Sequence, residues 1–475
     1  MMKNITLALT CLLLTVASNG QRYLTPQFTN VDVATNIKYG ENLGYNTSFL
    51  NTEDLVMDVY TPAGDTVSNR PVIILGHGGS FLSLYTWGVK EQYSIVELCK
   101  RYARLGYVAV SINYRLGWAA GDNDAETREK TIINAVYRAM QDFKTCIRYF
   151  RKDAVNGNTY RINPCKIFVG GTNSGGYAAL ACSMLNQQSE LTGIKFLDGS
   201  GNPYINQSLT GDFDGFGGSQ NINNYPGFSS RPSAILALGT ATGDTTWVQA
   251  GEVPVVAFHG VEEVTTPYNT ARVITSSGTP IIVVSGSGDF MPYVDALGNN
   301  NIFKGKGFAP GPPNKQNGVV LQPVEGLYPF YGQGFEPWSW YDGAQPIGDP
   351  NLNPGASQTK AMKFIDTIMQ YSTVRFFEII KDTASCQFTT GVNEQQQLAA
   401  KIYPNPVNQT LHISFEDAAK PTTITLTSLT GSVLITKEQV TKEEYLEVGG
   451  LPCGSYLLTI SDGTSVNRKK VVIIH

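Results

Sequence analysis

The sequence predicts an α/β protein with a mostly parallel central sheet and helices on both faces, followed by a small all-β sandwich. The first observation is that runs of strand length alternate with segments of helical periodicity from Asp54 to about Ser385. The second is that residues 401–475 change to short alternating runs between turn residues. The third is length, because 475 residues are about three times a usual domain of roughly 150.

The elements follow from these patterns. Strands are expected at 54–60, 71–76, 107–112, 166–171, 233–238 and 254–259. Helices are expected at 91–104, 127–152 and 358–382. The helix 91–104, for example, places Ile95, Leu98 and Tyr102 on one face and ends before Gly106. The stretches 198–232 and 303–358 are rich in Gly, Pro and Asn, so they are expected to be long functional loops.

Composition excludes some classes of protein. The net charge is −4, and no Lys/Arg block is present, which argues against a nucleic-acid binder. Apolar residues make up 42% of the chain, enough for a sizeable core, which excludes disorder for most of it. The chain has only four histidines, a count that limits which residues can act as a base.

The first twenty residues read as a signal peptide. Lys3 precedes an apolar run, 5–17, that is too short to span a bilayer, and cleavage is expected before Gln21. Cys11 lies inside this run, so it is expected to be a core residue and not a lipid attachment site. No later segment is long and apolar enough for a membrane helix. The mature protein is therefore expected to be secreted or held at the cell surface.

Export makes disulfides permissible, and six cysteines remain after cleavage. Six cysteines allow fifteen pairings, and the sequence does not choose among them. No CxxC pair is present, so no zinc or other metal site is expected, and nothing in the sequence indicates a cofactor.

Three motifs stand in order along the first part of the chain. They are Asp58-Val59-Tyr60-Thr61-Pro62, His77-Gly78-Gly79-Ser80-Phe81 and Ser111-Ile112-Asn113-Tyr114-Arg115-Leu116. Together they resemble the carboxylesterase and lipase-like α/β-hydrolases. The resemblance implies that the amides of Gly78, Gly79 and Ser174 form an oxyanion hole.

In that family, strand five ends in a G-x-S-x-G turn that presents the nucleophilic serine. Here the corresponding residues are Gly171-Thr172-Asn173-Ser174-Gly175, so Asn173 stands at the nucleophile position. Asn is one of the few residues enriched at the positive φ of such a turn. An alternative frame makes Ser174 the nucleophile. That frame lacks the first glycine and turns the side chain by about 100°.

The other two triad positions differ from each other. Glu263, in the segment from His259 to Tyr268, matches the triad acid, while His259 itself is expected to be structural. In the segment from Leu327 to Trp338, Phe335 stands at the position of the family's histidine. His77, His412 and His475 lie elsewhere, so no histidine remains to activate a serine. Candidate aromatic residues for the rim of a ligand pocket are Tyr85, Trp87, Trp338, Trp340 and Tyr341.

The last part of the chain carries a second resemblance. Tyr403-Pro404-Asn405-Pro406-Val407, Leu451-Pro452-Cys453-Gly454-Ser455-Tyr456 and the basic final run 469–473 resemble the type A sorting domain of the type IX secretion system of the Bacteroidota. The resemblance implies that the secretion machinery handles residues 401–475, carries the protein across the outer membrane and removes this domain. A carbohydrate-binding β-module is the alternative.

The expected organisation is a signal peptide (1–20), an α/β-hydrolase-like domain (21–390), a linker (391–400) and the sorting domain (401–475). The favoured function is a catalytically inactive pseudo-esterase that binds a small-molecule, ester or glycan ligand, or that acts as a surface module. The alternative is an active carboxylesterase that uses Ser174 or another non-standard nucleophile. A purely structural role at the cell surface is the third hypothesis.

Overall fold

A computed structural model describes residues 22–45, 51–82, 89–274, 278–341, 353, 355–384, 386–389, 400–415, 421–428, 432–462 and 466–475. The predicted signal peptide and nearly all of the predicted linker lie outside these described residues. No helix within the described ranges is long and apolar enough to cross a membrane.

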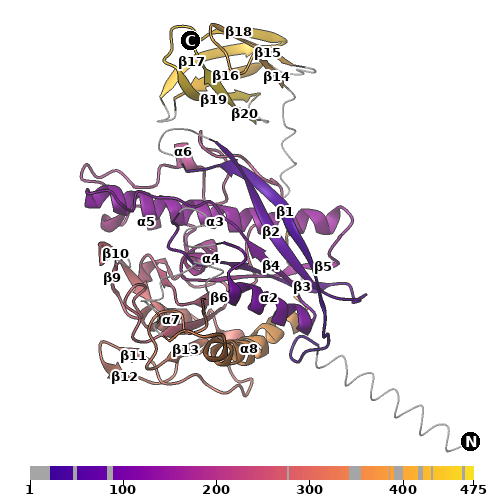
Figure 1. Cartoon of the computed structure of the whole chain (residues 1–475), viewed down its shortest axis with the longest axis vertical. Coiled ribbons are helices and arrows are strands. Elements are labelled where there is room, and N and C mark those ends of the chain that lie inside the picture. Colours follow the sequence, from indigo (N-terminus) through magenta and orange to yellow (C-terminus); the bar gives the residue numbers. More distant parts are fainter. Residues whose placement is uncertain are drawn as a thin grey trace, which may run out of the picture.

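The core of the larger part of the chain is an eight-stranded sheet (Figure 1). Its strands stand in the order β1 (Val31–Leu43), β2 (Thr52–Pro62), β4 (Val108–Ile112), β3 (Arg70–Gly76), β5 (Ile162–Thr172), β6 (Ala234–Leu238), β8 (Val255–Gly260) and β13 (Leu327–Phe330). The pairs β1–β2 and β2–β4 are antiparallel, and every other pair is parallel. The predicted α/β class with a mostly parallel sheet is therefore confirmed.

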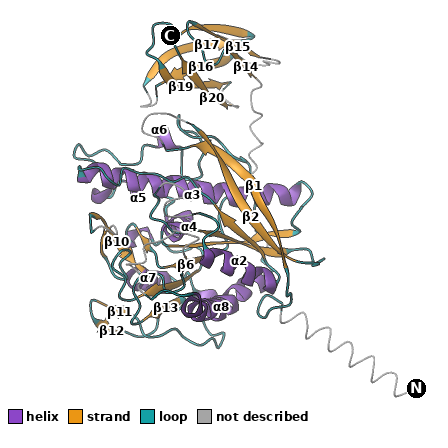
Figure 2. Cartoon of the chain, in the orientation of Figure 1, coloured by secondary structure: helices purple, strands orange, loops and turns teal. Residues whose placement is uncertain are grey.

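Helices cover both faces of this sheet (Figure 2). Helices α2 (Tyr93–Leu105) and α8 (Gln358–Lys381) pack in one apolar cluster, and α3 (Ala125–Val155), α4 (Ser174–Met184) and α7 (Ser287–Ala296) pack in another. The three expected helices are confirmed within a few residues. Local signals fix their ends: the Asp124 side chain caps the start of α3, and Gly106 ends α2 with φ 106°.

Several elements were not expected from the sequence. One is the edge strand β1, in which residues 32–36 are exposed, so its first half lacks a buried apolar run. The stretch 303–358, expected as a loop, contains a short hairpin of β11 (Lys315–Gln316) and β12 (Val319–Val320) and also β13. A second small sheet joins β7 (Ala241–Thr242), β10 (Pro280–Gly286) and β9 (Ala271–Ile274). The stretch 198–232 does remain largely irregular, with only α6 (Gln207–Thr210) inside it.

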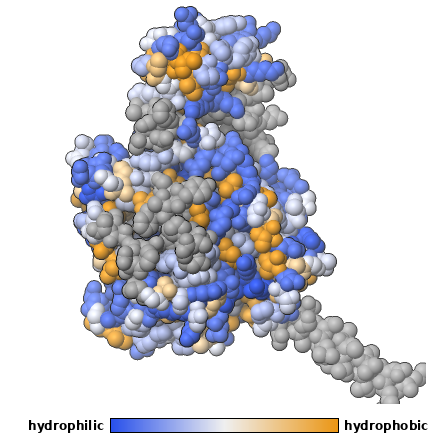
Figure 3. All heavy atoms as spheres, in the orientation of Figure 1, coloured by the Kyte–Doolittle hydropathy of each residue, from blue (hydrophilic) through white to orange (hydrophobic). Residues whose placement is uncertain are grey.

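Two small sheets with their own apolar core make up the described residues after 400, as expected for an all-β sandwich. One sheet joins β14 (Ala400–Tyr403), β15 (Thr410–Phe415) and β18 (Glu443–Glu447). The other joins β17 (Val433–Val440), β16 (Thr422–Thr427), β19 (Gly454–Ser461) and β20 (Val466–Ile473). The face of the molecule seen in Figure 3 is mainly hydrophilic, with smaller apolar areas between.

A disulfide joins Cys165 on β5 to Cys386, which follows α8. Cys99, Cys146 and Cys182 are buried free thiols, and Cys453 is exposed. The bridge closes a loop of 221 residues and therefore ties the end of the hydrolase-like domain back to the central sheet.

Candidate functional site

The tight turn between β5 and α4 presents Asn173 at its apex. Asn173 has φ 48° and ψ −118°, the strained backbone expected for a nucleophile elbow. A Cβ on Gly171 would lie 2.5 Å from the backbone of Gly175, and a Cβ on Gly175 would lie 2.4 Å from the Gly76 carbonyl oxygen. Only glycines fit at these two positions, which supports the register that places Asn173 at the apex.

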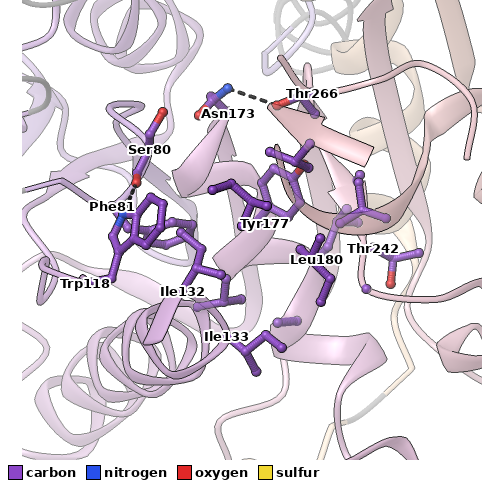
Figure 4. Close-up of a pocket in the computed structure, with 18 of the residues that line it drawn as sticks. Ser80, Phe81, Trp118, Ile132, Ile133, Asn173, Tyr177, Leu180, Thr242 and Thr266 are labelled. Atoms are coloured by element: carbon purple, nitrogen blue, oxygen red, sulfur yellow. Dashed lines mark hydrogen bonds between the residues drawn. The ribbon is translucent and has the colours of Figure 1, made fainter. Parts of the chain in front are cut away.

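Both polar ends of the Asn173 side chain make hydrogen bonds within the protein. Its Oδ1 accepts a hydrogen bond from the Ser174 amide at 2.8 Å, and its Nδ2 donates to Thr266 Oγ1 at 3.1 Å (Figure 4). The residue is 7% exposed and lines a cavity. A carboxamide in this place holds the turn together but offers no ionisable group for nucleophilic attack.

The neighbouring Ser174 faces the interior. It is fully buried, and its Oγ lies 3.0 Å from Tyr114 Oη, which in turn donates to the His77 carbonyl oxygen at 2.7 Å. The cavity beside Asn173 is lined without it. Among the described residues, the serine hydroxyl therefore has Tyr114 and no histidine as its hydrogen-bond partner, and it does not line that cavity.

The expected oxyanion loop follows β3. The Gly78 amide donates to Oε1 of Gln92 at 2.8 Å, and the Ser174 amide donates to Asn173 Oδ1. Two of the three expected oxyanion donors are thus bonded to side chains of the protein itself. Gln92 is a residue that the sequence analysis missed, and it lies just before α2, 14 positions after Gly78. No local motif marks it.

The loop beyond Gly78 is held in an unusual backbone conformation. Gly79, Ser80 and Phe81 have φ values of 111°, 54° and 55°. The indole N–H of Trp118 donates to the Ser80 carbonyl oxygen at 2.9 Å and so holds the loop in place (Figure 4). Gly79 and Ser80 line the same cavity as Asn173.

The acid position is occupied by a buried carboxyl group. Glu263 Oε1 accepts hydrogen bonds from the Thr265 hydroxyl and, at 3.3 Å, from the Thr266 amide. Among the described residues, Oε2 has no hydrogen-bond partner. The nearby Glu336 backbone amide nevertheless favours the charged form of the carboxyl group. Burial dominates and raises the pKa of Glu263 to about 8. Glu263 is thus a buried carboxyl group whose neutral form is favoured, at the position where the sequence predicts the triad acid.

Phe335, at the position expected for the histidine, is partly exposed and lines the cavity. The next residue, Glu336, is a second one that the sequence analysis missed. It is 2% exposed, its Oε2 accepts a hydrogen bond from Ser339 Oγ at 2.7 Å, and burial raises its pKa. A Cβ on Gly78 would lie 3.2 Å from its Oε1, so this carboxyl group sits directly against the oxyanion loop.

None of the four histidines of the chain lines the cavity. His77 stacks on the Tyr114 ring, with Nδ1 2.6 Å from the Gly78 carbonyl oxygen. His259 has Nδ1 2.9 Å from Ser287 Oγ and Nε2 2.9 Å from the Thr266 carbonyl oxygen, as fits the expected structural role. Burial lowers the pKa of both rings to about 4, so both are neutral at pH 7.

The cavity extends from the elbow into an apolar space between α3, α4 and the small sheet of β9 and β10 (Figure 4). It measures about 180 Å³. No Lys, Arg or His is among its described lining residues. Its walls are mainly aliphatic and aromatic side chains: Ile132, Ile133, Val136, Leu180, Leu185, Leu191, Phe196, Ile205, Trp247, Ile281, Ile282 and Val284.

The five aromatic residues expected at the rim have different places. Tyr341 lines the cavity. Trp338 does not fit the expectation, because it is fully buried and its indole donates to Thr172 Oγ1 at 3.0 Å behind the elbow. Trp340 stacks on the Tyr93 ring at 5.6 Å instead of facing the cavity. Tyr85 and Trp87 lie outside the described residues.

A metal centre finds no support in the part of the chain that the structure describes, where no group of three or more His, Cys, Asp or Glu side chains could hold an ion.

Comparison with known proteins gives two family matches. Residues 57–216 match the BD-FAE family model, and residues 401–474 match the secretion system C-terminal sorting domain. No curated protein matches the chain.

The structure is also similar to that of an esterase of Thermogutta terrifontis. Esterase 2 in its apo form has 16% sequence identity, with a TM-score of 0.39 over 74% of this chain and 96% of that chain. The same esterase phosphorylated by paraoxon has 18% identity and a TM-score of 0.36 over 73% and 97% of the two chains.

A type IX sorting domain directs export to the cell surface or secretion. The chain therefore carries an esterase-like α/β-hydrolase domain, which matches the BD-FAE family model over residues 57–216, followed by a C-terminal sorting domain of this secretion system.

Proposed function

We propose that this exported protein is a catalytically inactive member of the esterase-like α/β-hydrolases and that it binds a ligand in the cavity beside Asn173. The single observation that carries the proposal is the hydrogen-bonded carboxamide at the apex of the elbow. Acyl transfer needs an activated nucleophile at this point, and an amide nitrogen is not one. The residue at the histidine position, Phe335, supplies no base either.

The filled oxyanion hole supports the same proposal independently. An oxyanion hole works by holding unoccupied donors where negative charge develops. Here the amides of Gly78 and Ser174 donate to Gln92 and Asn173. A tetrahedral intermediate would have to displace both side chains before it gained these bonds.

The alternative, an active esterase that uses Ser174, is disfavoured by geometry. Its hydroxyl is fully buried against Tyr114, and no histidine side chain is hydrogen-bonded to it. Burial raises the pKa of Tyr114 above its ordinary value, so the phenol stays protonated and is a poor base at neutral pH.

We propose ligand binding because the cavity beside Asn173 is still open although the residues at the nucleophile and histidine positions are substituted. A void lined by apolar side chains costs stability unless it is used. The described lining combines a broad apolar wall with polar groups that include Asn173, Thr266 and Glu336. This distribution is typical of small-molecule sites.

The test is to incubate the purified protein with short-chain p-nitrophenyl esters and with a fluorophosphonate probe, alongside the Ser174→Ala variant. We expect no hydrolysis above that of the variant and no labelled peptide. Labelling at Ser174, or turnover that is lost in Ser174→Ala, would overturn the proposal. Circular dichroism on both proteins establishes that each is folded.

A further inference from the structure

We propose that the cavity selects an uncharged apolar molecule that ends in a hydroxyl group, a long-chain or ring alcohol, over the carboxylate or ester that an esterase site would take. The inference rests on the proposed function, since it names the ligand class for the same cavity. Three features of the polar end of the cavity carry it.

The first feature is that two of the three expected donors for a carbonyl oxygen, the amides of Gly78 and Ser174, are occupied. Gly78 donates to Gln92 Oε1 and Ser174 donates to Asn173 Oδ1, each at 2.8 Å. A ligand carbonyl or carboxylate that took one of these amides would leave a buried side-chain oxygen without its partner. Losing one buried hydrogen bond in this way weakens binding by about tenfold.

The second feature is the absence of a positive partner. The described lining contains no Lys, Arg or His, while Glu336 lines the cavity itself. Its Oε1 lies against Gly78, and Glu263, which interacts electrostatically with Glu336, lies next to it. A ligand carboxylate would therefore lose its hydration, gain no counter-charge and approach the Glu336 carboxyl group.

The third feature is that a hydroxyl group matches the remaining hydrogen-bonding groups at the polar end of the cavity. A hydroxyl both donates and accepts. Among the described residues, Asn173 Nδ2 donates one of its two N–H groups to Thr266 Oγ1, and the other has no acceptor. Glu336, next to Asn173 at the oxyanion loop, offers carboxyl oxygens as acceptors. An alcohol oxygen between Asn173 and Glu336 can use both, whereas an ester has no hydrogen to donate to Glu336.

The rest of the cavity sets the apolar part of the ligand. Behind the polar end, the walls are formed by residues such as Ile133, Leu180, Phe196 and Ile282, which present only hydrocarbon surface. Each methylene that enters such a wall contributes about a further fourfold in affinity, the equivalent of roughly 0.8 kcal/mol. An unbranched ten-carbon chain is therefore a suitable probe.

The experiment compares 1-decanol, decanoate and methyl decanoate for their ability to displace the neutral dye N-phenyl-1-naphthylamine from the wild-type protein at pH 7. The three probes share one chain and differ only at the polar end. We expect 1-decanol to bind at least about tenfold more tightly than either of the others. Equal or tighter binding of decanoate or methyl decanoate would overturn the ligand class, and so would failure of all three to displace the dye.

Two variants test the residues named. Gln92→Ala frees the Gly78 amide, so methyl decanoate should gain about tenfold relative to 1-decanol. Glu336→Gln replaces the carboxyl group by an uncharged amide that can donate a hydrogen bond to a carboxylate, so decanoate should gain most. The control is Gln27→Ala, because the Gln27 side chain is exposed and, among the described residues, its amide group donates only to Thr25. Unchanged preferences in a folded Gln92→Ala protein would contradict the role of the filled oxyanion hole.

The two proposals fail in different ways. Release of decanoate from methyl decanoate by the wild-type protein would contradict the proposed lack of catalysis. A preference for decanoate without any hydrolysis would contradict only the ligand class.

Discussion

The side-chain oxygen of Gln92 accepts the hydrogen bond of the Gly78 amide at 2.8 Å, so the oxyanion loop is closed by a residue from the start of α2. This contact lies apart from the two substituted triad positions, Asn173 and Phe335. Three separate segments of the chain, at β3, β5 and after β13, therefore bear on whether ester chemistry is possible. Restoring activity should need changes at more than one of them.

The first prediction is that Asn173→Ser combined with Phe335→His creates measurable ester hydrolysis. Either change alone should give almost none, because a serine hydroxyl without its imidazole is a poor nucleophile and triad members act as a unit. The predicted acid is already in place, since Glu263 Oε2 has no hydrogen-bond partner among the described residues. The measurement is p-nitrophenyl acetate turnover by the double variant and both single variants.

The polar ring of Phe335→His costs about 1–3 kcal/mol of stability, so each variant must first be shown to fold by its thermal melt. A folded, inactive double variant together with fluorophosphonate labelling of wild-type Ser174 would show that the elbow register is one residue off.

The second prediction is that adding Gln92→Ala to the double variant raises kcat further. Asn173→Ser already releases the Ser174 amide, and Gln92→Ala releases the Gly78 amide, so both donors become free for the oxyanion. One oxyanion donor is worth about 10²- to 10³-fold in kcat. A change in KM without a rise in kcat would contradict this role for Gln92. So would a rise in kcat of the same size when the exposed control Gln27→Ala is added instead.

The third prediction concerns pH. Burial raises the pKa of Glu263 to about 8 from a reference of 4.5, so between these pH values the folded protein holds a proton that the unfolded chain has released. Its contribution therefore lowers the free energy of unfolding as pH rises from 4.5 to 8, by on the order of a few kcal/mol. In Glu263→Gln the free energy of unfolding should fall less steeply with pH. The variant should therefore be more stable than the wild type at pH 8 but not at pH 5.

Urea denaturation at several pH values checks this third prediction. The quantity to compare is the difference between variant and wild type, because Glu53 and Glu252, whose pKa values burial raises to about 7, give slopes of the same sign. Glu126→Gln serves as the control at an exposed position. A parallel shift of the Glu263→Gln curve at all pH values would mean that the carboxyl group is not protonated in the folded state.

The fourth prediction is that replacing both Cys165 and Cys386 by Ala destabilises the hydrolase-like domain by about 2–5 kcal/mol. The bridge closes a loop of 221 residues, so its loss lets the unfolded chain expand and frees the segment after α8. Cys453→Ser, at an exposed free cysteine, is the control and should leave the melting temperature unchanged. Equal melting temperatures for all three proteins, under non-reducing conditions, would contradict the prediction.

Much of the fold could be predicted because its strands are buried on both faces. β3 and β4 are buried throughout, so they stand out as continuous apolar runs between loops. The edge strand β1 could not be found in this way, since its exposed face leaves a polar pattern without clear alternation. The hairpin of β11 and β12 is only two residues long on each side, too short to have a period.

The site divides along a similar line. Asn173 could be placed from the sequence because the glycines around it are required by close backbone contacts and therefore mark the turn. Gln92 and Glu336 could not, because each acts through a contact with a residue distant in sequence, Gly78, and no local pattern reports that contact. Trp338 is the reverse case: its aromatic side chain predicts a rim residue, but its indole N–H donates to Thr172 Oγ1 inside the fold.

The fifth prediction concerns maturation in the native host. The protein should begin near Gln21, after removal of the predicted signal peptide, and should end between about residues 390 and 400, before the sorting domain. The upstream limit follows from two contacts of the described residues. The Ser229 backbone amide donates to the Phe388 carbonyl oxygen at 2.9 Å, and Thr389 forms a β-bridge with Phe228, so the backbone at Phe388 and Thr389 is held against the hydrolase-like domain. Proteases cut backbone that is free of such bonds. Intact mass of the exported protein measures both ends, and a mature species that still carried Tyr403 to His475 would contradict removal of the sorting domain.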